Sequence, residues 1–156
     1  MSNTKNDILQ KLKFDANNYD LNLNLGMLQI NEKNYNQSKI TFKKLISFNK
    51  KRYEAYLNLS NIENINNNFK ESEKILKKFI TKNGYNKEII SALSILYYNI
   101  RDFKKLQFTV KQYIDLEENH ILNYLKAILL EEENQINNSI IFLGKSISAN
   151  NKFWPA

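Results

Sequence analysis

The sequence predicts an all-α fold, a right-handed superhelical solenoid of about four helix-turn-helix repeats preceded by one further helix. The first observation behind this prediction is that the 156 residues include 3 Gly and 1 Pro, too few for the many turns of a chain built from short strands. The second is that apolar residues recur at helical spacing, for example at Leu93, Leu96, Tyr97 and Ile100. The third is that the apolar pattern returns every 34 residues, an interval typical of a repeat made of two helices.

The 34-residue period is carried by a large apolar residue followed directly by a small one, in the pairs Leu25-Gly26, Leu59-Ser60 and Leu93-Ser94. An aromatic residue stands ten positions after the first member of each pair, at Tyr35, Phe69 and Phe103. Two further apolar series keep the same interval, Phe42, Leu76 and Val110 in one and Leu45, Phe79 and Tyr113 in the other. Polar clusters at 31–34, 66–68 and 101–102 separate two helical segments within each unit. Because neither helix can bury its apolar stripe alone, we expect neighbouring units to stack on one another.

These residues resemble the tetratricopeptide repeat, whose pattern has a bulky residue, then Leu-Gly, later an Ala, an aromatic residue, another Ala and a closing Pro. The match is close over residues 24–38 and again over 55–61. On this resemblance residues 1–18 form a partial leading repeat of one helix. Four repeats follow, at 19–52, 53–86, 87–120 and 121–152. Residues 153–156 are the start of a further repeat or a truncated end.

The pattern also departs from the family at several positions. The small residue expected at the helix crossing is Leu106 in the third repeat, where we expect the packing to loosen or shift. No repeat has the closing Pro, and the fourth has Ile128 in place of Gly or Ser and is one residue short near Gln135. The pentatricopeptide repeat, which reads RNA, is the main structural alternative, but the Leu-Gly and Leu-Ser pairs and the Ser residues at the crossing favour the tetratricopeptide reading.

Residues for catalysis or metal binding are scarce in this sequence. The absence of Cys excludes disulfides, thiolate zinc sites and thiol nucleophiles. The single His, His120, falls in a predicted turn where we expect it to be solvated. The run Glu131 to Glu133 does not converge on one point, because successive helical residues point about 100° apart. We therefore predict no enzyme activity, no cofactor and no metal. The alternative is that the chain is the N-terminal repeat region of a larger enzyme, such as a glycosyltransferase or sulfotransferase.

The formal charge of +7 raises the question of nucleic-acid binding, but 21 of the 23 basic residues are Lys. Phosphate clamps and base contacts favour the bidentate guanidinium of Arg, so we predict no nucleic-acid partner. No apolar run approaches the roughly 18 residues of a membrane span, and the N-terminus lacks the apolar core of a signal peptide. These features predict a soluble cytoplasmic protein that does not bind a membrane.

In the tetratricopeptide family the first helix of each repeat lines an inner, concave groove, and the second helix lies outside. On this resemblance most of the lysines belong to the outer surface. The inner surface combines acidic residues, Asn residues whose amides suit an extended peptide backbone, and apolar residues. We therefore predict a scaffold that binds a protein or extended peptide segment, neutral to basic in charge, through Asp20, Leu23, Asn24, Met27, Glu54, Leu57, Asn58, Asn61, Glu88, Ile95 and Tyr98.

The row of Asn at 24 and 58 resembles the Asn ladder of the O-linked N-acetylglucosamine transferase superhelix, but Ala92 and Lys126 interrupt it. The carboxylate clamp that some family members use for chaperone tails is rejected, because Asn58 alone matches its pattern.

The last predicted helix carries an apolar stripe, and no polar capping helix follows it. We therefore expect the chain to be incomplete or partnered at its C-terminus, with association through this uncapped helix. The stripe consists of Ile136, Ile140, Leu143 and Ile147.

Overall fold

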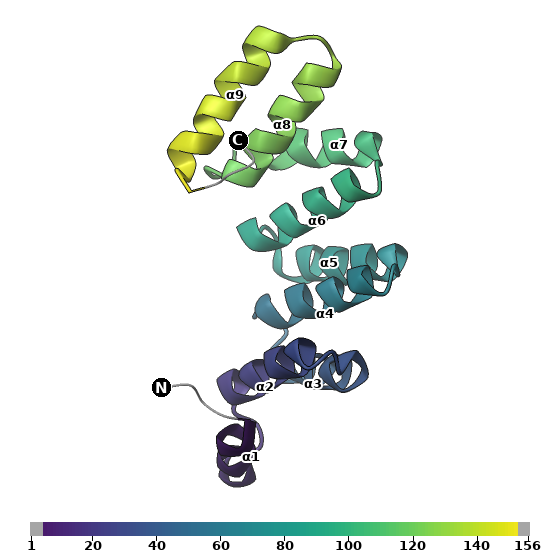
Figure 1. The fold of residues 1–156 in the computed structure, drawn as a ribbon, viewed down its shortest axis with the longest axis vertical. Helices are drawn as coiled ribbons and strands as arrows, with labels where there is room; N and C mark the ends of the chain where they lie inside the picture. The colour runs from purple at the N-terminus through teal and green to yellow at the C-terminus, as the bar shows by residue number, and fades with distance from the viewer. Residues whose placement is uncertain (1–4, 153–156) are drawn as a thin grey trace. The chain divides into compact units, whose positions relative to one another are not determined.

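A computed structural model of the chain describes residues 5–152, and over these residues all regular structure is α-helical (Figure 1). The all-α class and the helix-turn-helix arrangement predicted from the sequence are confirmed. The predicted start of a further repeat at 153–156 lies outside the described residues. The described part forms two compact units that meet in the chain at Gly84 and Tyr85. The first contains α1 (Lys5–Phe14), α2 (Tyr19–Asn31), α3 (Tyr35–Phe48), α4 (Glu54–Ile65) and α5 (Phe69–Asn83). The second contains α6 (Lys87–Asn99), α7 (Phe103–Tyr113), α8 (His120–Glu132) and α9 (Ile136–Ala149).

The same tight turn joins the two helices of each pair. Its left-handed residue is Lys33, Asn67, Arg101 or Asn134, with φ of 58°, 59°, 57° and 58°. In each turn a backbone N–H donates to the carbonyl five residues earlier, which satisfies a free acceptor at the helix end. These bonds run from Asn34, Asn68, Asp102 and Gln135 to Gln29, Glu63, Tyr97 and Leu130, at 2.8, 2.8, 2.9 and 2.8 Å. The polar clusters in the sequence are therefore the turns that reverse the chain.

In the first unit α2 packs on α3, α4 packs on α5, and α3 lies against α4. The small residues of the repeat pattern mark the crossing of α2 and α3. A Cβ atom built on Gly26 would lie 2.7 Å from the ring of Phe42, a distance that side chains do not adopt. On the opposing helix the buried Ser38 hydroxyl donates to the Gly26 carbonyl at 2.8 Å. The Leu25-Gly26 pair is thus required by the close approach of an aromatic ring.

In the second unit α8 pairs with α9, α6 with α7, and α7 lies against α8. Leu106, at the position where the repeat pattern expects a small residue, is fully buried. A leucine there fills space but donates no hydrogen bond. The buried hydroxyl of Ser94, the third repeat's equivalent of Gly26, has no hydrogen-bond partner among the described residues. Leu106 therefore provides apolar packing at the crossing of α6 and α7, where Ser38 forms a hydrogen bond at the crossing of α2 and α3.

Candidate functional site

Eight of the predicted site residues lie on α2 and α4 of the first unit, which are in contact. On each helix they occupy positions i, i+3, i+4 and i+7, which share one side of an α-helix. We call this surface the α2/α4 face. It consists of Asp20, Leu23, Asn24 and Met27 from α2, and Glu54, Leu57, Asn58 and Asn61 from α4.

The two acidic residues of this face are held together by a cation that the sequence prediction missed. Arg52, in the connection between α3 and α4, places one guanidinium nitrogen 2.8 Å from Asp20 Oδ1 and another 2.6 Å from Glu54 Oε1. The guanidinium carbon lies 4.0 Å from the centroid of the Tyr19 ring, in cation–π contact. Asp20 and Glu54 therefore do not act as two free charges: with Arg52 they form a cluster of net charge −1.

The environment of this cluster fixes its ionisation. Burial opposes ionisation of Glu54, but the hydrogen bonds and charge of Arg52 outweigh it, so the pKa of Glu54 lies below its usual value. Burial, and then the nearby Glu54 carboxylate, raise the pKa of Tyr19 to about 12. At neutral pH Glu54 is therefore ionised and the Tyr19 phenol is neutral.

The remaining side chains of the α2/α4 face are polar amides and half-exposed apolar groups. Asn24 and Asn61 are exposed, whereas the half-buried Asn58 donates to the Glu54 carbonyl at 2.8 Å within its own helix. That bond uses one of the two amide hydrogens of Asn58, and the side-chain oxygen takes no part in it. Met27 is 46% exposed, so its thioether side chain adds apolar surface to this face.

The other three predicted site residues belong to the second unit. Glu88, Ile95 and Tyr98 are all exposed on α6. On α8, by contrast, Leu125 and Leu129 are 2% and 6% exposed and so belong to the core of this unit. They are unavailable to a ligand.

The environment of His120 differs from the expected solvated turn. It is the first residue of α8, is partly buried, and has a ring nitrogen 3.4 Å from the Asn150 amide. Burial, and then the charge of Lys87, lower its pKa. Within residues 5–152 there is no group of three His, Asp or Glu residues placed to hold a metal ion. None of the described helices is long and apolar enough to cross a membrane.

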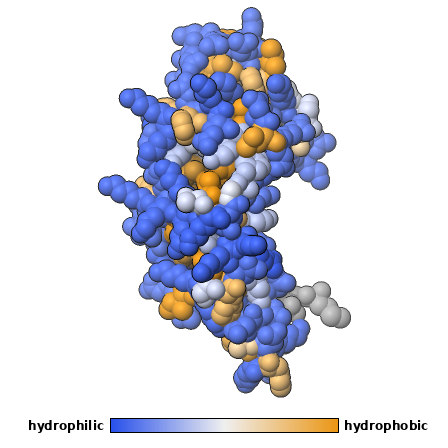
Figure 2. Space-filling model, turned by 180° about the vertical axis from the view of Figure 1, so that it is seen from behind, coloured by the Kyte–Doolittle hydropathy of each residue, from blue (hydrophilic) through white to orange (hydrophobic). Residues whose placement is uncertain are grey.

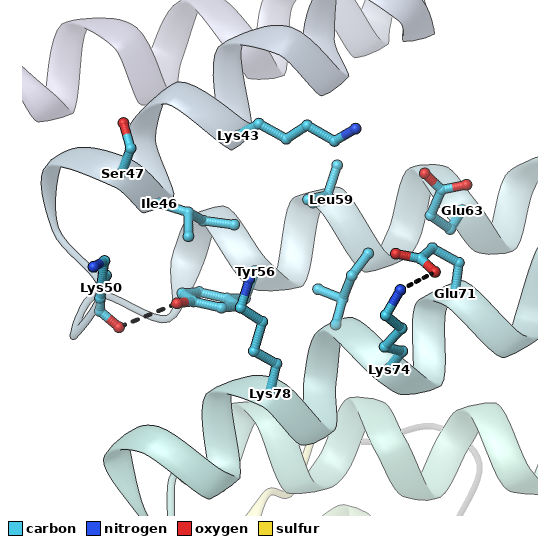
Figure 3. A pocket seen from close by; sticks show the side chains of 11 residues that line it. Lys43, Ile46, Ser47, Lys50, Tyr56, Leu59, Glu63, Glu71, Lys74 and Lys78 are labelled. Atoms are coloured by element: carbon cyan, nitrogen blue, oxygen red, sulfur yellow. Dashed lines mark hydrogen bonds and ion pairs between the residues drawn. The ribbon is translucent and has the colours of Figure 1, made fainter.

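The first unit also contains a cavity of about 570 Å³ between α3, α4 and α5 (Figure 3). The sequence pattern assigned lysines to the outer surface, but it gave no sign of this hollow. Its walls are basic and acidic side chains, and its base is apolar. The lining residues are Lys43, Ile46, Ser47, Lys50, Tyr56, Leu59, Glu63, Glu71, Lys74, Ile75 and Lys78.

Three comparisons bear on the family of this chain. A family model described as tetratricopeptide repeat matches residues 19–52. No curated protein matches the chain in sequence. Several solved structures share its fold. MamA has a TM-score of 0.71 at 17% identity, over 95% of this chain and 87% of that chain. A thermophilic tetratricopeptide repeat protein of Thermus thermophilus, TTC0263, has a TM-score of 0.72 at 15% identity, over 96% and 82%.

A third similar structure is YrrB, a tetratricopeptide repeat protein described as having an unusual peptide-binding site. Its TM-score is 0.60 at 10% identity, over 97% of this chain and 96% of that chain. At these low identities the similar structures show the fold alone, and the family model matches residues 19–52 alone. Together they confirm the resemblance on which the repeat assignment was based: the chain carries a tetratricopeptide repeat and has the fold of the tetratricopeptide repeat proteins.

Proposed function

We propose that the chain is a scaffold whose α2/α4 face binds an extended segment of another protein. The observation that carries the proposal is the repetition, on two helices in contact, of the order acid, Leu, Asn at the same helical spacing. Asn side chains offer donors and an acceptor to the alternating N–H and C=O groups of an extended backbone. Leu23, Leu57 and Met27 stand beside them and supply apolar area for the side chains of the ligand.

The charge of this face favours a neutral to basic peptide. Asp20 and Glu54 contribute two negative charges and Arg52 contributes one positive charge, so the cluster is negative by one. The attraction for a basic peptide is modest, because Arg52 already neutralises part of the negative charge of Asp20 and Glu54. We therefore expect apolar burial and backbone hydrogen bonds to supply most of the affinity, with charge selecting among sequences.

The proposal is tested with peptides selected from a random library on the immobilised chain, then measured by fluorescence anisotropy. The double variant Asn24→Ala, Asn58→Ala should weaken their binding by at least about tenfold, since two sets of backbone hydrogen bonds are lost. Asn36→Ala, Asn137→Ala changes two exposed Asn residues outside this face and serves as the matched control. Equal affinity for all three proteins would place the peptide elsewhere and overturn the proposal.

We propose no catalytic activity for the chain itself. Repeat folds of this kind bind partners along their surfaces. The described residues offer no feature that favours the alternative, a repeat region that serves a larger glycosyltransferase or sulfotransferase. We also propose a cytoplasmic location, on the composition of the sequence.

Association through α9 is a second proposal, supported by its exposed apolar side. Ile136, Ile140 and Ile147, which share one side of the helix, are 52%, 60% and 45% exposed. The helix carries a single charge, Lys145, so two copies can meet along it with little like-charge repulsion. Sedimentation velocity should show a concentration-dependent dimer that is lost in Ile140→Lys. A monomer at every concentration would contradict this proposal but would not bear on peptide binding by the α2/α4 face.

A further inference from the structure

The geometry points to a second binding site in the first unit: the cavity between α3, α4 and α5 accepts an acidic peptide segment that inserts one apolar side chain. None of its lining residues belongs to the α2/α4 face. At about 100° per residue, Tyr56 and Glu63 of the cavity lie on the opposite side of α4 from Glu54 and Asn58. The two sites can therefore be occupied and mutated independently.

The base of the cavity is apolar and pre-formed. Tyr56, Leu59 and Ile75 are 1%, 4% and 8% exposed, so they are fixed by the core of the unit. The Tyr56 ring packs edge-on against Phe79, with centroids 5.1 Å apart, and its hydroxyl donates to the Lys50 carbonyl at 3.4 Å. A volume of about 570 Å³ lies within the range of side-chain and small-molecule pockets. Because these three residues expose little surface, an inserted leucine or phenylalanine side chain would make its apolar contact mainly with the half-buried Ile46, above this packed base.

The rim of the cavity is basic, and its acids are already paired. Glu71 binds Lys74 at 3.1 Å. Glu63 is bound by Lys39 at 2.8 Å, and the amide of Asn68 donates to it at 3.0 Å. Burial opposes ionisation of Glu63, but the bonds from Lys39 and Asn68, with the charges of Lys39 and Lys43, hold its pKa below the usual value.

Three cations of the rim remain for a ligand. Lys43 comes from α3, Lys50 from the turn after it and Lys78 from α5, so they surround the apolar base from different elements (Figure 3). None of the three forms an ion pair with the described residues, so each can pair with a carboxylate arriving from outside, and Lys43 also acts on Glu63 through its charge. The lining as a whole carries four Lys and two Glu, a net charge of +2.

An acidic peptide fits this arrangement better than a nucleic acid does. The cations are separate lysines around an apolar base, and the rim contains no Arg to clamp a phosphate. Glu63 and Glu71 interrupt the basic surface and would repel a continuous phosphate backbone. A peptide that alternates carboxylates with apolar residues can place its carboxylates on the lysines and an apolar side chain on Ile46 and Ile75. The face seen in Figure 2 is mostly hydrophilic, with its apolar residues in small separate patches.

The test uses a fluorescein-labelled peptide with a central Leu-Phe pair flanked by Asp-Glu on each side, measured by anisotropy. We expect binding that weakens at least about tenfold in Lys43→Gln, Lys78→Gln and that falls with salt. The matched control is Lys104→Gln, Lys111→Gln, the same charge change on α7, which should leave affinity within about twofold. A second variant, Ile46→Asn, keeps every charge and should also weaken binding. Circular dichroism verifies that each variant is folded.

Three outcomes overturn the inference. The first is acidic-peptide binding that is unchanged in both Lys43→Gln, Lys78→Gln and Ile46→Asn, or no measurable binding to the wild-type chain. The second is that a labelled mixed-sequence single-stranded RNA binds more tightly than the acidic peptide and loses its binding in Lys43→Gln, Lys78→Gln. That result would make the cavity part of a nucleic-acid site. The third is loss of the acidic peptide in Asn24→Ala, Asn58→Ala, which would assign it to the α2/α4 face.

Discussion

Replacing Arg52 by Met should lower stability and raise affinity for basic peptides at the same time. Met keeps the length and apolar character of the side chain but removes its charge. The Asp20 carboxylate is 73% exposed, so its ion pair contributes a few tenths of a kcal/mol at most. The Glu54 side chain is 25% exposed and is bound through two nitrogens, which contributes about 1 kcal/mol. The contact with the Tyr19 ring adds roughly 0.5 kcal/mol. We expect a loss of about 1 to 2 kcal/mol in the free energy of unfolding.

The binding effect has the opposite sign because the cluster changes its charge. With Arg52 removed, Asp20 and Glu54 carry −2 in place of −1. A peptide with two or three lysines should then bind roughly three- to tenfold more tightly at low salt. The gain should shrink as salt rises, because exposed charges are screened beyond about 8 Å at physiological ionic strength.

Urea unfolding followed by circular dichroism measures the first effect, and anisotropy with a library-selected basic peptide measures the second. Arg101→Met is the control, since Arg101 is exposed, lies in the second unit and forms no ion pair with the described residues. If Arg52→Met weakens the basic peptide, the guanidinium itself contacts the ligand and the charge argument fails. If unfolding is unchanged, the bridge between α2 and α4 contributes nothing measurable.

Further substitutions test the packing and the pH dependence. Gly26→Ala should cost about 1 to 3 kcal/mol, because its Cβ would meet the Phe42 ring at 2.7 Å, whereas Gly144→Ala, with nothing within 4 Å, should stabilise the helix by roughly 0.5 to 1 kcal/mol. Leu93→Ala should cost about 2 to 5 kcal/mol, since its side chain is 3% exposed, and a loss below about 0.5 kcal/mol would contradict its place in the core. The pKa of Glu63 is lowered on folding, so its stabilisation is complete above the unfolded value of about 4.3 and is lost as pH falls through the folded value. Urea midpoints should therefore fall less steeply on acidification in Glu63→Gln than in the wild-type chain.

Periodic features of the fold could be predicted because each is determined by local chemistry that repeats. The small residue after Leu25 follows from the approach of Phe42, and the polar clusters follow from turns that need left-handed residues such as Asn67. The left-handed residues lie 34 residues apart at 33, 67 and 101 and then 33 apart at 134, the same shortening that the sequence shows near Gln135. Patterns of this kind are readable because the same backbone geometry imposes them in every repeat.

Features that occur once could not be predicted in the same way. Arg52 stands outside the helices, and no repeat period marks it, so its position depends on the path of the turn between α3 and α4. That path is extended at Asn49, with φ −141° and ψ 98°. The cavity likewise depends on side-chain volumes that fail to fill the space between three helices. The sequence pattern places His120 in a turn although it begins α8, because the end of a helix is defined only to within one or two residues.

The charge distribution around α4 explains how a chain of net charge +7 can present an acidic site. On the side of α4 that carries Glu54, this acid and Asp20 of α2 are partly neutralised by Arg52. On the side that carries Glu63, the acid is neutralised by Lys39, and further lysines are left over. The two surfaces lie on opposite sides of one helix and carry charges of opposite sign, −1 for the cluster of Asp20, Glu54 and Arg52 and +2 for the residues that line the cavity. A net charge computed for the whole chain therefore predicts the ligand of neither surface. The sign of the charge that a ligand must carry follows from which lysines and carboxylates remain after pairing within the fold.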